Sequence, residues 1–132
     1  PEEARSSLTG RLFRGITLSY IFTYASAPPF NIQAGVDLNN DTNNNDRPLG
    51  IGRNTGRGFD FASVDLRLSR LIRFGDRWSL ELLAEGFNIL NGSNYSVPNN
   101  IFGINQSPRP GFGSPTVALD ARQFQFGMKI SM

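Results

Sequence analysis

Aspartate and asparagine alternate along one polar stretch of the sequence, and their oxygen atoms have a spacing that could serve a cation. The five residues are Asp37, Asn39, Asp41, Asn43 and Asp46. Hard cations such as calcium take several carboxylate and amide oxygens as ligands. The pattern departs from an EF-hand loop, because Thr42 replaces the expected glycine and Pro48 the expected glutamate. The alternative is a turn-rich loop whose Asp and Asn side chains hydrogen-bond their own backbone.

Glu81 and Glu85 are the other carboxylates whose spacing invites a chemical interpretation. Four residues apart on a strand, they lie about 13 Å from one another, wider than the separation that glycosidases normally keep. Facing Arg67 and near Arg73, they are better explained as a ladder of ion pairs. The sequence has no Cys and no His, which excludes thiolate zinc sites, histidine bases and cysteine nucleophiles. We expect no enzyme activity.

The strongest structural pattern is a two-residue alternation in the last ten residues. Apolar side chains alternate with polar or small ones up to the end of the sequence, which predicts a strand with one apolar and one polar face. The apolar positions, which we also expect to act as a C-terminal assembly signal, are Phe124, Phe126, Met128, Ile130 and Met132.

The same alternation predicts an all-β fold, an antiparallel meander of about five long strands. The strands are expected near residues 4–12, 16–26, 62–74, 78–90 and 121–132, with long loops at 27–61 and 91–120. A loop around Gly15 and another around Gly75 should be short hairpin turns. No run approaches the roughly 18 apolar residues of a transmembrane helix.

Both faces of the third and fourth predicted strands indicate one register. If Phe74 lies opposite Trp78, then Arg67 lies opposite Glu85 on the polar face. Opposite charges across a ladder contribute about 0.2–1 kcal/mol. The polar and apolar faces therefore predict the same pairing.

Short and long connections alternate, as in bacterial outer-membrane barrels with tight periplasmic turns and long extracellular loops. The strands are about as long as the 9–11 residues that a tilted strand needs to cross a bilayer. Arg70 falls on the apolar face, where a charge costs about 2–4 kcal/mol at the midplane and little near the interface. We expect it to extend toward the periplasmic headgroups. The alternative is a secreted or surface β-sandwich that recognises carbohydrate, with the Asp/Asn loop binding calcium.

Several segments resemble the late strands and loops of TonB-dependent outer-membrane receptors, in the style of Oar-like receptors that carry a carboxypeptidase-regulatory-like domain. They are Pro29–Ile32, Asp37–Asp41, Asn45–Pro48, Gly52–Asn54, Val64–Arg70, Leu80–Leu82, Glu85–Asn91 and Gln125–Lys129. The resemblance implies a 22-stranded barrel, of which this chain is the C-terminal part. It also implies an N-terminal plug and a TonB-contacting box, neither of which is in this sequence. The family's last residue is usually aromatic, whereas here it is Met132.

This resemblance implies TonB-energised uptake of a scarce nutrient across the outer membrane of a Gram-negative-type bacterium. Its expected partners are outer-membrane lipid, the barrel-assembly machinery, TonB and an unknown small ligand. Residues at the barrel mouth and in the second long loop could contact that ligand or merely cap the barrel; they are Asn88, Asn91, Asn94, Phe102 and Phe112. A net charge of +2 is too small to indicate a nucleic-acid partner.

Overall fold

The computed structural model describes Gly10 and residues 13–132. The chain forms two compact units. The sheet unit comprises residues up to Phe22, Ser63–Asn91 and Arg122–Met132, and the loop unit comprises Thr23–Ala62 and Gly92–Ala121. The predicted strand near residues 4–12 lies outside the described residues except for Gly10.

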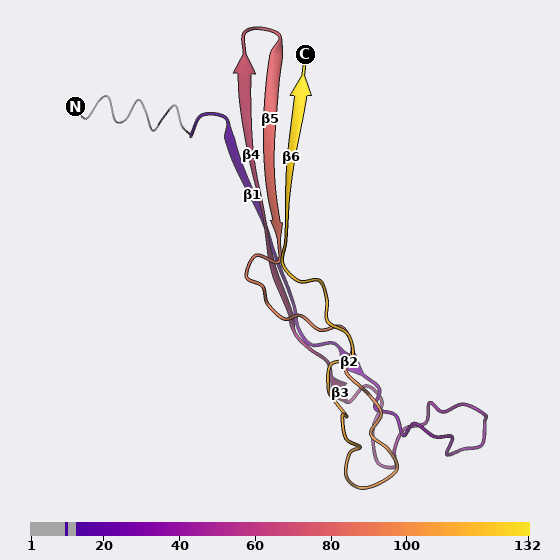
Figure 1. The fold of residues 1–132 in the computed structure, drawn as a ribbon. Coiled ribbons are helices and arrows are strands. Elements are labelled where there is room, and N and C mark those ends of the chain that lie inside the picture. The colour runs from indigo at the N-terminus through magenta and orange to yellow at the C-terminus, as the bar shows by residue number, and fades with distance from the viewer. Residues whose placement is uncertain (1–9, 11–12) are drawn as a thin grey trace. The chain divides into compact units, whose positions relative to one another are not determined.

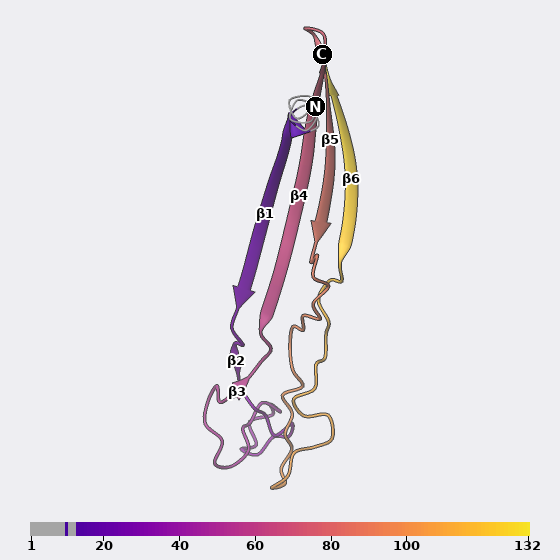
Figure 2. The ribbon, with the colours of Figure 1, turned by 90° about the vertical axis from the view of Figure 1, so that its left-hand side faces the viewer.

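Antiparallel strands make up the secondary structure. The long strands are β1 (Ile16–Ala25), β4 (Phe61–Phe74), β5 (Trp78–Phe87) and β6 (Gln123–Ser131). They form one sheet in the order β1-β4-β5-β6, with each long strand beside the next one along the chain (Figures 1 and 2). The all-β, antiparallel meander predicted from the sequence is therefore confirmed.

The predicted register is also confirmed. Phe74 pairs with Trp78, and Arg67 pairs with Glu85, in the ladder between β4 and β5. The ladder continues into β6, where Leu82 lies opposite Met128. Since side chains alternate between the two faces, these pairings place most of the apolar residues of the three strands on one face. Leu71 and Leu83 are exceptions and lie on the face of Arg67 and Glu85.

Glycine forms the two predicted turns. Gly15 has φ 75° and Gly75 has φ 64°, a left-handed conformation that glycine adopts without the steric cost of a Cβ atom. The carbonyl oxygen of Gly15 accepts a hydrogen bond of 2.8 Å from the amide of Leu71. This bond ties the start of β1 to β4.

The sheet is a single layer, and its apolar face is uncovered. No large side chain of the described residues is fully buried, and Ala34 is their buried apolar residue. Leu68 is 46% exposed, Met128 is 70% exposed and Phe126 is 82% exposed. A soluble sandwich would bury this face against a second sheet, so the described residues do not form one.

Two details of the sequence prediction are wrong. The strand predicted to reach residue 90 ends at Phe87, because Asn88 adopts a left-handed conformation with φ 48°. The first long loop, predicted to hold no strand, contains β2 (Pro29–Phe30) and β3 (Gly56–Arg57), which pair with one another. Pro29 has no amide hydrogen to donate, which is tolerated here because proline is compatible with an edge strand.

Candidate functional site

Backbone hydrogen bonds join the two long loops within the loop unit. The amide of Gln33 donates to the carbonyl of Asn100 and its carbonyl accepts from the amide of Phe102, both at 2.8 Å. The side chain of Asn100 adds a hydrogen bond of 3.1 Å to the carbonyl of Asn31. The two loops can approach each other closely because Gly35 has no Cβ atom. A Cβ atom at this position would lie 2.6 Å from a methyl carbon of Ile101. The loops thus hold each other in place.

Asn94, a predicted ligand contact, makes a structural clamp. Its side-chain oxygen accepts a hydrogen bond of 3.1 Å from the amide of Ala62, and its side-chain nitrogen donates one of 2.8 Å to the carbonyl of the same residue. Asn94 is 7% exposed. Beside it, the Tyr95 ring packs edge-on against Phe59, with 5.4 Å between the ring centroids. Asn94 therefore fixes the backbone at the end of the first loop.

Replacing Asn94 by alanine should loosen this part of the loop unit. The change removes both hydrogen bonds to Ala62, each contributing about 0.5–1.5 kcal/mol. Hydrogen exchange should therefore become faster at the amide of Ala62. Asn45 is exposed and makes no side-chain hydrogen bond with the other described residues, so Asn45→Ala is the matched control and should leave that exchange rate unchanged. Equal rates in the two variants would contradict the clamp.

The Asp/Asn stretch forms a network of turns. One carboxylate oxygen of Asp46 accepts hydrogen bonds from the amides of Leu38 and Asn39, at 2.6 and 3.0 Å. The carboxylate of Asp37 accepts from the amides of Asp41 and Thr42, at 3.2 and 2.8 Å. This is the geometry of the turn-rich alternative, in which side chains satisfy the backbone of their own loop.

Asp41 lies at the centre of this network. Its Oδ1 accepts a hydrogen bond of 2.9 Å from the amide of Asn43, and its Oδ2 accepts one of 3.1 Å from the side chain of Asn39. The backbone bond from Asn43, followed by the side-chain bond from Asn39, lowers the pKa of the Asp41 carboxyl below its ordinary value. The carboxylate is therefore held in its charged form.

Calcium binding by this stretch stays a prediction. Within the described residues, no group of three or more His, Cys, Asp or Glu side chains is arranged to hold a metal ion. The position where an EF-hand has glycine does adopt a left-handed conformation, since Thr42 has φ 73°. A β-branched residue is strained in that conformation. The hydrogen bond that the Thr42 amide donates to the Asp37 carboxylate helps to hold it there.

A hollow of about 420 Å³ lies in the loop unit, between the first and second long loops. Its walls are mostly apolar and include Leu38, Ile51 and Phe102. The Phe102 ring packs edge-on against Phe112, with centroids 5.2 Å apart. Among the predicted ligand contacts, Phe102 and Phe112 are thus brought together, and Phe102 reaches the hollow. None of the described residues that line this hollow is charged, which favours a ligand that is uncharged where it contacts the hollow.

The other two predicted ligand contacts, Asn88 and Asn91, belong to the sheet unit. The amide of Asn88 donates a hydrogen bond of 2.9 Å to the carboxylate of Asp65, and its carbonyl accepts one of 2.8 Å from the amide of Asn91. Asn88 is 6% exposed. Both residues have positive φ angles, so they form the turn that ends β5.

The predicted polar pair is present and is part of a longer row. Arg67 and Glu85 form an ion pair with 3.5 Å between nitrogen and oxygen, and Gln125 donates a hydrogen bond to the other carboxylate oxygen of Glu85. At 54% and 22% side-chain exposure, this pair contributes about 0.2–1 kcal/mol. The expected ladder does not extend to Glu81, which lies opposite Leu71 and Lys129 instead of an arginine.

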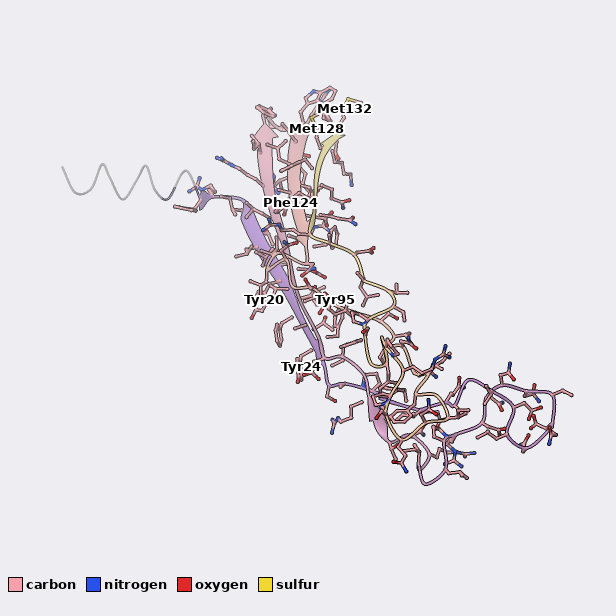
Figure 3. All side chains as sticks on the ribbon, turned by 60° about the horizontal axis from the view of Figure 1, so that its bottom comes forward. Tyr20, Tyr24, Tyr95, Phe124, Met128 and Met132 are labelled. Atoms are coloured by element: carbon pink, nitrogen blue, oxygen red, sulfur yellow. The ribbon has the colours of Figure 1, made fainter. Side chains whose placement is uncertain are left out.

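The predicted C-terminal signal occupies the apolar face of β6. Phe124, Met128 and Met132 follow one another along this end of the chain (Figure 3). The strand ends at Ser131, so Met132 lies just beyond it. The whole of β6 is exposed, and its apolar positions continue the uncovered face of β4 and β5.

Sequence reasoning missed Asp65 and Arg122. The Asp65 carboxylate accepts a hydrogen bond from the amide of Asn88. The Arg122 guanidinium lies 5.8 Å from the centroid of the Phe124 ring. Arg122 also donates a hydrogen bond of 3.4 Å to the carbonyl of Ile89. No local spacing signals the hydrogen bonds of Asp65 with Asn88 and of Arg122 with Ile89, because each joins segments that are distant in the sequence.

None of the described residues belongs to a helix long and apolar enough to span a membrane. Residues 48–125, more than half of the chain, match the family model described as "outer membrane beta barrel domain". No curated protein matches the chain, and no solved structure does.

Proposed function

Because the chain belongs to the outer membrane beta barrel domain family, we propose that it forms part of the wall of a TonB-dependent receptor. The family places the protein in the outer membrane. The proposed receptor takes up a scarce nutrient, with energy supplied through TonB from the inner membrane. The chain supplies wall and loops to this process, and no catalytic residue.

The observation that carries the proposal is the difference between the two faces of the sheet. One face exposes large apolar side chains such as Leu68 and Met128, which lipid tails can cover. The other face carries the row of Arg67, Glu85 and Gln125, which suits a polar barrel interior. The β-sandwich alternative needs a second sheet over the apolar face, and the described residues provide none.

The loops support a receptor role. Hydrogen bonds between Gln33 and the segment Asn100–Phe102 hold two long loops together, and an apolar hollow lies within the loop unit. A preformed surface binds a ligand at a lower entropic cost than mobile loops would. In the proposed orientation the loops face outside and the turn at Gly75 faces the periplasm. The barrel-assembly machinery would recognise the apolar face of β6 as its insertion signal.

In-cell crosslinking tests TonB dependence directly. Bacteria that express the natural full-length protein, treated with formaldehyde, should yield an adduct that antibodies to both the protein and TonB detect. A variant lacking the segment that contacts TonB should lose this adduct while staying in the outer membrane. If the natural protein forms no adduct under nutrient limitation, TonB energisation is wrong, and outer-membrane barrel membership is unaffected.

A further inference from the structure

A basic hollow lies at the turn end of the sheet unit, where the chain enters β1 beside β4. Its volume is about 440 Å³, within the roughly 300–1,000 Å³ of ligand pockets. The lining consists of Arg14, Gly15, Arg70, Leu71, Ile72 and Arg73. Three of these six residues carry guanidinium groups, and none of the six is acidic.

Arg70 has an unsatisfied donor at this hollow. Its Nε atom is buried and has no hydrogen-bond partner among the described residues. An unpaired buried donor costs about 1–3 kcal/mol, and more when it is charged. A guanidinium group presents its donors in a planar fork that matches the oxygens of carboxylate and phosphate groups. An anionic oxygen in the hollow would therefore satisfy Arg70.

The register places this donor on the membrane-facing side of the sheet. Arg70 lies opposite Leu82, and Ile72 lies opposite Leu80. The positions of β5 on this face hold Trp78, Leu80, Leu82 and Ala84, so β5 brings no carboxylate to Arg70. The nearby acid Glu81 is on the other face, opposite Leu71. An anion that pairs with the Arg70 Nε atom would therefore come from outside the described residues.

We propose that Arg14 and Arg70 bind the phosphate group of a membrane lipid. The hollow lies beside an apolar face that includes Leu68 and Leu82, against which the acyl chains of the same lipid would lie. A soluble anion would gain the contact with the guanidinium groups but not the contact with this face. The inference rests on the chain's place in the outer membrane and is independent of TonB and of the transported ligand.

Native mass spectrometry of the protein in nonionic detergent can measure this binding. Dioleoyl phosphatidylglycerol is the probe, and dioleoylglycerol, which has the same acyl chains and no phosphate, is the matched lipid. We expect adducts with phosphatidylglycerol at concentrations where dioleoylglycerol gives none. Arg14→Gln and Arg70→Gln should each weaken binding about fivefold. Arg53→Gln, which removes the same charge from the loop unit, should have no effect.

Two further measurements separate the alternatives. Arg14→Lys with Arg70→Lys keeps both charges and should retain more binding than the glutamine variants, which distinguishes phosphate recognition from a folding defect. Inorganic phosphate should not displace the lipid. Equal adducts with both lipids, unchanged binding by both glutamine variants, or displacement by inorganic phosphate at the lipid's own concentration would each overturn the proposed lipid site.

Discussion

Replacing Leu68 by arginine should lower the free energy of unfolding in lipid vesicles by about 2–4 kcal/mol. Leu68 lies near the middle of β4 on the apolar face and is 46% exposed. A charge at this depth loses its hydration without gaining a partner, since the opposite residue on β5 is Ala84. Urea titration of the refolded protein, monitored by circular dichroism, measures the change.

The neighbouring residue provides the control. Ser69 is on the same strand and faces the other side of the sheet, opposite Leu83. Ser69→Arg should change the free energy of unfolding by much less than Leu68→Arg, because water in the barrel interior can solvate the charge. Similar losses for the two variants would mean that the two faces have similar surroundings, which contradicts the membrane-facing assignment.

Gly86→Ala should destabilise the sheet by about 1–3 kcal/mol. A Cβ atom at Gly86 would lie 3.0 Å from a carbon of the Phe124 ring, and closer still to the Cδ1 atom of Ile89. Both atoms belong to side chains, so the Ile89 side chain and the ring of Phe124, the cross-strand partner of Gly86, must leave their present positions to make room for the methyl group. The midpoint of urea unfolding in vesicles should fall accordingly.

Gly127→Ala is the matched control for this variant. Gly127 is also a strand glycine, on β6, and its added Cβ atom would meet only Leu83, at ordinary contact distances of 3.7 Å and more. Alanine should be neutral or stabilise the strand by up to about 1 kcal/mol, because glycine loses more conformational freedom on folding. A Gly86→Ala variant as stable as Gly127→Ala would show that the Ile89 and Phe124 side chains move aside freely.

The sheet could be predicted from the sequence because two independent patterns indicate one register. The alternation of apolar residues and the pairing of Arg67 with Glu85 both depend on the short turn at Gly75, which leaves little freedom for slippage. The end of β5 could not be predicted this way. The end of this strand depends on the hydrogen bond that the Asn88 amide donates to the Asp65 carboxylate, and Asp65 is distant from Asn88 in the sequence.

The candidate site was less predictable than the sheet. The sequence leaves open whether Asn94 and Phe102 contact a ligand or merely cap the barrel. In the structure Asn94 clamps the backbone of Ala62, and Phe102 lines the hollow. An asparagine side chain uses the same donor and acceptor atoms whether it stabilises a turn, clamps a backbone segment or binds a ligand. Only its neighbours in space distinguish these roles, and local sequence does not specify them.

The central claim is that the apolar face contacts lipid, and a tryptophan placed on that face tests it. Trp78, the one tryptophan of the sequence, lies on the turn side of Arg70, so it is first replaced by phenylalanine. Phe126, which lies opposite Ala84 and is 82% exposed, is then replaced by tryptophan. In vesicles of lipids brominated on their acyl chains, we expect strong quenching of this tryptophan's fluorescence, and weak quenching by aqueous iodide. Strong quenching by iodide, with none by the brominated lipids, would contradict the claim.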